Sequence, residues 1–222
     1  MINDYALLTR LPLLQGISST ELLSWEEALR LDIDELPASK LPLIHQGETC
    51  TQLLWLVEGE LIREHHSENG VYAIRSTLKA PAAIETDRLF GLYTTYEYTY
   101  WAHSDVRMLS IGKNLTNLYL MKSEVFRINL LNTLSAISQK KTMALIPSQL
   151  GNTEERLKHF LCTLLTGHEG KVEVFIQMKD LAHYIGRSRL NTSRLLNQWH
   201  AEGIITLGRE NFIIHDIQTL RN

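Results

Sequence analysis

The stretch GRSRLNTSRLLNQW, residues 186–199, decides how the end of this chain folds. A glycine opens it, and Ser188 follows at a position suited to cap a helix. Apolar Leu195, Leu196 and Trp199 then recur at helical spacing. Arginines and short polar side chains precede that apolar stripe. The stretch therefore predicts a helix that buries one face and presents basic and polar groups at its N-terminal end.

A second helix and a hairpin flank this stretch. MKDLAHYIG predicts a short helix that ends at Gly186, and IITLGRENFIIHD predicts two short strands around a turn at Gly208. Helix, tight turn, helix and hairpin are the parts of a winged helix-turn-helix, whose second helix enters the DNA major groove by its N-terminal end. Residues 181–201 contain no acidic side chain, which suits an anionic partner.

The sequence pattern of the preceding part of the chain is typical of a β-roll. From about residue 36 to residue 111, short apolar runs are separated by turn residues at regular intervals. The Asn69-Gly70 pair lies between two such runs and is a strong hairpin signal. In LYTTYEYTYW, residues 92–101, tyrosines alternate with polar residues, which predicts a strand with one aromatic face. These patterns predict an antiparallel, jelly-roll-like β-roll.

The strand pattern ends at about Gly112. Residues 114–146 contain no glycine or proline and predict a short helix followed by a long one, from about Lys122 to Ile146. Pro147 marks a break after that helix. The predicted fold class is therefore α+β. We expect the β-roll over residues 1–113, the long helix within 114–147 and the winged helix-turn-helix over 148–222.

Composition excludes several classes of protein. The net charge of −3 gives no sign of a polyanion partner at the level of the whole chain. The sequence has no apolar run long enough for a membrane span, and its N-terminus does not resemble a signal peptide. Two distant cysteines, Cys50 and Cys162, form neither a disulfide framework nor a metal-ligand cluster. We therefore expect a cytoplasmic location.

Enzyme motifs are missing from the sequence. It contains no Gly-x-Ser-x-Gly, no P-loop and no His-x-His set of a metal-binding barrel. His65 and His66 are adjacent, so on a strand they would point to opposite faces. We expect no enzymatic activity. Two classes stay open: a DNA-binding regulator, which the local charge favours, and a docking module whose winged helix binds protein.

Three segments resemble the Crp/Fnr family of bacterial transcription regulators. AHYIGRSRLNTSRLLNQWHAEGII, residues 182–205, is similar to the family's helix-turn-helix, with Gly, Ser-Arg and Ser-Arg at the matching positions. LLTRLPLLQGISSTEL, residues 7–22, resembles its opening helix, and LIHQGETCTQLLWLVEGEL, residues 43–61, resembles its β-roll. The resemblance covers nearly the whole chain, with the parts in the same order.

The resemblance implies a regulator that binds double-stranded DNA as a homodimer. The roll would be a cyclic-nucleotide-binding-like sensor domain, the long helix would make the dimer, and RNA polymerase becomes a candidate partner. Arg189 would read a guanine, while Leu190 replaces a glutamate common in the family and offers only apolar contact, for example to a thymine methyl. The residues predicted to bind DNA are Gln177, Lys179, Arg187, Ser188, Arg189, Leu190, Asn191, Ser193, Arg194 and, on the wing, Arg209.

The ligand of the roll is less defined. A cyclic-nucleotide site of this family needs a Gly-Glu pair and then Arg followed by Ser or Thr, but Ile84 precedes Glu85, and Tyr96-Glu97 occupy the later position. A cyclic nucleotide is therefore disfavoured, and two cysteines cannot hold an iron–sulfur cluster. No cofactor is predicted, although haem and a small apolar effector stay open. The residues predicted to line an effector pocket are Glu85, Arg88, Tyr96, Glu97 and Tyr98.

Overall fold

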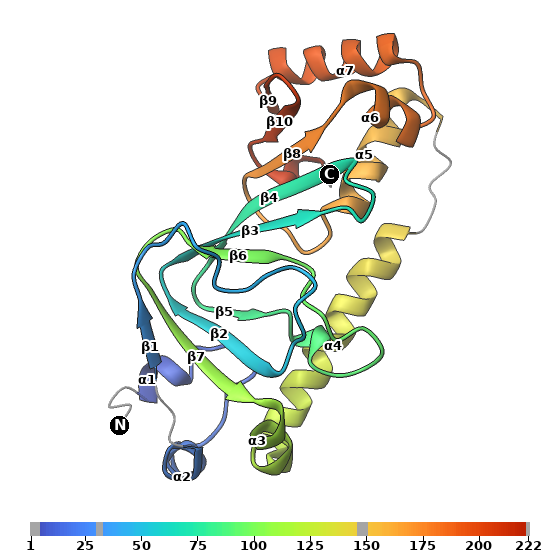
Figure 1. Cartoon of the computed structure of the whole chain (residues 1–222). Coiled ribbons are helices and arrows are strands. Elements are labelled where there is room, and N and C mark those ends of the chain that lie inside the picture. The colour runs from blue at the N-terminus through green and yellow to red at the C-terminus, as the bar shows by residue number, and fades with distance from the viewer. Residues whose placement is uncertain (1–4, 30–32, 146–150, 221–222) are drawn as a thin grey trace. The chain divides into compact units, whose positions relative to one another are not determined.

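A computed structural model describes residues 5–29, 33–145 and 151–220 (Figure 1). Contacts divide the chain into two compact units: residues 1–63 with 78–136, and residues 64–77 with 137–222. The predicted α+β class is confirmed, with antiparallel sheets, a long helix and a C-terminal helix-turn-helix. The predicted helix end at Ile146 and break at Pro147 lie outside the described residues.

The first unit is built on a four-stranded antiparallel sheet in the order β1-β7-β2-β5. The sheet contains β1 (Ile33–Leu36), β2 (Gln52–Glu58), β5 (Ala82–Ile84) and β7 (Val106–Gly112). β2 is central, and its run of apolar residues from 53 to 57 is buried throughout. Trp55 is fully buried, and its indole N–H donates to the carbonyl of Pro12 at 2.7 Å. This bond anchors the segment between α1 (Tyr5–Leu8) and α2 (Ser19–Leu29) to the sheet.

A tight turn at Gly59 connects β2 to β3 (Glu60–His66). Gly59 has a φ of +91°, and a Cβ atom there would lie 2.5 Å from the carbonyl oxygen of Asp105. Only glycine therefore fits, because any side chain would both strain the backbone and collide with the next turn.

The predicted strand over residues 92–101 is right only in part. The regular strand β6 is Thr99–Ala102, and before it Thr95 makes an isolated bridge with Thr49. The physical reason lies in the backbone N–H groups of Glu97 and Tyr98. Both donate to the carboxylate of Glu85, so they are not available to a neighbouring strand.

Two helices follow β7: the short α3 (Lys113–Leu118) and the long α4 (Glu124–Leu145). The first half of α4 inserts Phe126 and Leu130 into the core of the roll. On its other side Ile128 and Leu131 are 49% and 63% exposed. The helix therefore exposes two large apolar side chains that the first unit does not cover.

The second unit contains the predicted winged helix-turn-helix. Its helices are α5 (Thr153–Leu164), which Asn152 caps, α6 (Met178–Tyr184) and α7 (Arg189–Ala201). The wing is formed by β9 (Ile205–Leu207) and β10 (Asn211–Ile214). β10 also pairs with β8 (Val172–Ile176), a strand that the sequence analysis did not predict.

The tip of the Asn69-Gly70 hairpin extends this second sheet. Residues 72–76 of β4 (Tyr72–Lys79) pair with residues 172–176 of β8 in antiparallel register, and Figure 1 shows the two strands side by side. Ile74 is 1% exposed and packs in the same core as Trp199. The hydroxyl of Ser76 lies 2.9 Å from Nδ1 of His168, and both residues are buried. A segment from the middle of the sequence thus completes the core of the C-terminal unit.

We expect Ile74→Ala to destabilise the C-terminal unit, although Ile74 lies far upstream in the sequence. Removing a large buried aliphatic side chain leaves a cavity that costs about 2–4 kcal/mol of unfolding free energy. Hydrogen exchange of the β8 amides should become faster, whereas Val71→Ala, near the hairpin tip, should change it little. Unchanged exchange of β8 in Ile74→Ala would contradict the pairing.

Candidate nucleic-acid interface

The turn between α6 and α7 fixes where α7 begins. Gly186 has a φ of +62°, and the hydroxyl of Ser188 accepts the backbone N–H of Asn191 at 3.2 Å. Thr192 is fully buried, and its hydroxyl donates to the carbonyl of Ser188 at 3.0 Å. Ser188 therefore caps the helix as predicted, and its backbone is held by the first turn.

The two faces of α7 differ in character. Leu195, Leu196 and Trp199 are buried in the core of the unit. In the first two turns the exposed residues are Arg189, Leu190, Asn191 and Arg194. Leu190 is 59% exposed, so a large aliphatic side chain stands beside two guanidinium groups and an amide. This end of the helix can donate hydrogen bonds and also make an apolar contact.

A hollow of about 290 Å³ brings together residues from three elements. Gln177 and Lys179 come from the start of α6, Arg189 from the start of α7 and Arg209 from the wing. These four predicted DNA contacts therefore lie on one concave surface, which we call the basic hollow. Glu210, which the sequence analysis did not single out, also lines it.

Two predicted contact residues serve the structure of the unit itself. The guanidinium of Arg187 donates to the carbonyl of Gly151, in the segment before α5. The hydroxyl of Ser188 is engaged in the helix cap. Ser193 is partly buried and accepts a hydrogen bond from Asn197 at 3.4 Å. Asn197 was missed by the sequence analysis, although its position four residues after Ser193 places it on the same helix face.

The structure also brings together the five residues predicted for an effector pocket. The carboxylate of Glu85 accepts the backbone N–H of Glu97 at 2.6 Å and that of Tyr98 at 3.0 Å. Arg88 forms an ion pair with the Glu97 carboxylate. Tyr96 and Tyr98 are buried in the core of the roll. Glu85, Arg88, Glu97 and Tyr98 are therefore linked to one another by hydrogen bonds and an ion pair, and Tyr96 lies in the core of the same unit.

Burial is the largest influence on the pKa values of Glu85, Tyr96 and Tyr98. It raises the pKa of Glu85 to about 7, and the hydrogen bonds from Glu97, Tyr100 and Tyr98 offset it only in part. Burial likewise raises the pKa of Tyr96 and Tyr98 above the ordinary tyrosine value. At neutral pH the tyrosines are therefore neutral, and Glu85 is near its midpoint.

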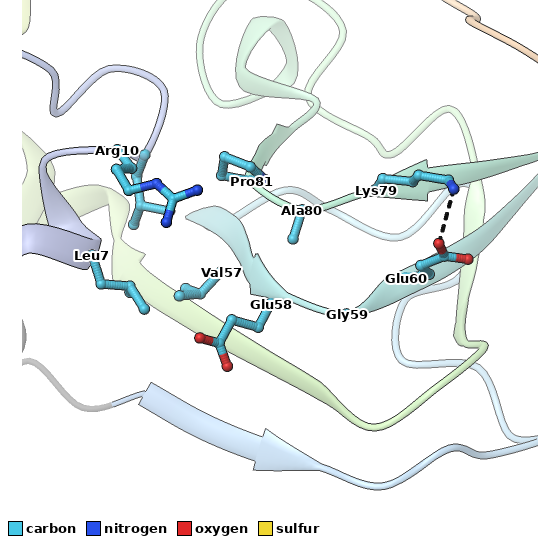
Figure 2. A pocket seen from close by; sticks show the side chains of 10 residues that line it. Leu7, Arg10, Val57, Glu58, Gly59, Glu60, Lys79, Ala80 and Pro81 are labelled. Atoms are coloured by element: carbon cyan, nitrogen blue, oxygen red, sulfur yellow. Dashed lines mark ion pairs between the residues drawn. The ribbon is translucent and has the colours of Figure 1, made fainter.

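A separate hollow of about 400 Å³ lies in the same unit (Figure 2). It is lined by Arg10 and Lys79 as well as Glu58 and Glu60, and Lys79 pairs with Glu60 at 3.1 Å. The mixed charges give this hollow no clear preference for an anion or a cation. It contains none of the five predicted effector residues.

Two further features bear on cofactor and location. Within the described ranges, no three His, Cys, Asp or Glu side chains gather in a way that could hold a metal ion. In that same part of the chain, no helix is both long enough and apolar enough to cross a membrane.

Comparisons with known proteins agree with this geometry. Residues 155–222 match the family described as the Crp-like helix-turn-helix domain. The catabolite activator protein of Thermus thermophilus shares the fold, with 19% identity and a TM-score of 0.52 over 95% of this chain and 96% of that one. The sensor domain of the regulator DNR from Pseudomonas aeruginosa is 16% identical, with a TM-score of 0.51 over 65% of this chain and 93% of that one. No curated protein sequence matches the chain.

Glu85 should make stability depend on pH. Its pKa of about 7 in the folded protein lies above the ordinary value of 4.5. A carboxyl group with a raised pKa favours folding while it is protonated; that contribution is complete below the ordinary value and is lost as the pH rises through the folded pKa. Between about pH 5 and pH 8, the wild type should therefore lose unfolding free energy relative to Glu85→Gln. Urea titrations of both proteins measure this difference, and an identical pH dependence would contradict it.

Proposed function

We propose that this chain is a regulator of the Crp/Fnr type that binds double-stranded DNA to regulate transcription. Its residues 155–222 match the Crp-like helix-turn-helix domain, and its fold is shared with a catabolite activator protein. The basic hollow carries this proposal, because it joins the start of α6, the start of α7 and the wing. These are the parts of a winged helix that face the groove and the phosphates beside it. A cytoplasmic location follows from this role. No observation favours a protein as the partner of this surface.

Each part of the surface has a distinct role in this proposal. Arg189 is exposed at the N-terminal end of α7, where a guanidinium can pair with N7 and O6 of guanine. Leu190 can contact a thymine methyl. Gln177, Lys179 and Arg209 would hold phosphates on either side of the groove. Arg194 would contact the backbone and Ser193 a base edge, as the resemblance implies.

A homodimer would place two such surfaces on one operator. The exposed Ile128 and Leu131 of α4 lie opposite the face that Phe126 and Leu130 bury in the roll. Pairing of this face between two copies would remove the apolar side chains from water. A two-fold dimer would also read two half-sites about one helical turn apart.

The first test compares Arg189→Ala with Lys179→Ala. A bidentate contact to guanine is worth roughly 1–3 kcal/mol of discrimination, so Arg189→Ala should weaken a selected cognate site by about ten- to a hundred-fold and random DNA far less. Lys179→Ala should weaken all sequences alike and lower the salt slope by about one. Binding titrations at several salt concentrations, on a cognate duplex selected from a random pool and on scrambled DNA, separate the two. Equal losses on both DNAs for Arg189→Ala would mean that Arg189 binds phosphate rather than a base.

A second test concerns the dimer. Leu131→Asp should convert the protein to a monomer at micromolar concentration, because the charge would be buried without a partner. Leu118→Asp on α3 is the matched control, since Leu118 is 52% exposed and lies outside the proposed interface. Light scattering measures both variants. A dimer that survives Leu131→Asp would place the interface elsewhere.

A further inference from the structure

Three neutral donors converge on one carboxylate inside the roll. Oε2 of Glu85 accepts the N–H of Glu97 at 2.6 Å. Oε1 accepts the N–H of Tyr98 at 3.0 Å and the hydroxyl of Tyr100 at 3.0 Å. We call these three donors the cradle. Both carboxylate oxygens are therefore engaged, and two of the donors are consecutive backbone amides.

Consecutive backbone N–H groups that point at one anion are a recurring way to bind phosphate or carboxylate. In this chain the anion comes from the protein itself, from the end of β5. The consequence is visible in the secondary structure, because the regular strand begins only at Thr99. The backbone gives up strand pairing at Glu97 and Tyr98 in order to hold the carboxylate.

Two features of Glu85 are energetically unfavourable, so the surrounding structure must hold the residue in this conformation. Glu85 has φ 39° and ψ 50°, a left-handed conformation that costs a residue with a side chain some strain. Its carboxylate is also largely withdrawn from water, and burial opposes ionisation. The three hydrogen bonds offset these costs in part.

Two cations from neighbouring elements each have a partner other than Glu85. Arg88, from the turn after β5, pairs with the carboxylate of Glu97. Arg63, from β3, lies over the ring of Tyr98, with its guanidinium carbon 5.3 Å from the ring centre. Tyr100 is 1% exposed and closes the site from β6.

We propose that the cradle is an anion site of the roll and that Glu85 is its built-in ligand. The roll is then held in a ligated form by its own carboxylate and needs no added anionic effector to order residues 85–100. If the side chain of Glu85 is removed, the vacated cradle takes a small free carboxylate. This inference concerns the roll alone and does not depend on the proposed DNA binding.

The test is chemical rescue of Glu85→Gly in the full-length protein. Glycine accepts the left-handed backbone without strain, so this variant removes the carboxylate and leaves the local conformation allowed. We expect the melting temperature to fall by about 5 °C, as two buried N–H groups lose their acceptor. Sodium formate should restore at least half of this loss, whereas sodium chloride at the same concentration should not. A melting temperature that falls but responds alike to formate and chloride would overturn the proposal.

Glu48→Ala is the matched control. The carboxylate of Glu48 also accepts a backbone N–H, that of His45 at 3.1 Å, but it does so at an exposed turn. Water can replace that acceptor, so formate should have no specific effect on this variant. A formate effect of equal size on Glu48→Ala would show that formate stabilises the protein non-specifically.

If Glu85→Gly does not fold, a measurement on the wild type still tests the proposal. Hydrogen exchange resolved by NMR should show the amides of Glu97 and Tyr98 protected in the wild type, and Glu85→Gln should accelerate at least one of them. A glutamine amide supplies one acceptor oxygen, while its NH₂ group opposes the second N–H. Fast exchange of both amides in the wild type would overturn the proposal. None of these measurements involves DNA, so they can contradict the cradle proposal without bearing on the proposed DNA binding.

Discussion

The burial of one face of α7 is the constraint on which the recognition surface depends. Leu195, Leu196 and Trp199 lie in the core of the C-terminal unit, and that packing sets the rotation of the helix. Given that rotation, Arg189, Leu190 and Arg194 must face solvent. The Ser188 cap fixes where the helix starts, so the exposed residues fall at its N-terminal end. Packing on one side thereby determines what the other side can bind.

The core that holds α7 is not drawn from the C-terminal sequence alone. Ile74, in the tip of a hairpin that continues the strands of the roll, fills part of it, and five residues of β4 extend its sheet. The chain passes between the two units at residues 63–64, 77–78 and 136–137. The hairpin is therefore a covalent connection in addition to α4. β3 and β4 each have residues in both units.

The roll shows a competition between two kinds of hydrogen bond. A regular strand through Glu97 and Tyr98 would pair their N–H groups with a neighbouring backbone. The carboxylate of Glu85 takes those donors instead. Three donors converge on this one side chain, and their hydrogen bonds offset part of the cost of its burial and its strained backbone. Hydrogen bonds to a side chain have here replaced the strand pairing that the alternating sequence predicts.

Local chemistry in the sequence was enough to determine the helix-turn-helix, the Asn69-Gly70 hairpin and the long α4, because caps, turn residues and apolar periodicity act within a few residues of one another. The same patterns located the exposed residues of α7, whereas Glu85 and Glu97 were singled out through the resemblance to the family's cyclic-nucleotide site. Only the tertiary structure decided which of these residues meet. The engagement of Arg187 with Gly151, the pairing of the hairpin tip with β8 and the contact of Glu85 with residues 97–100 each join segments separated along the chain. Such contacts arise from the packing of whole elements, and no local spacing in the sequence encodes them.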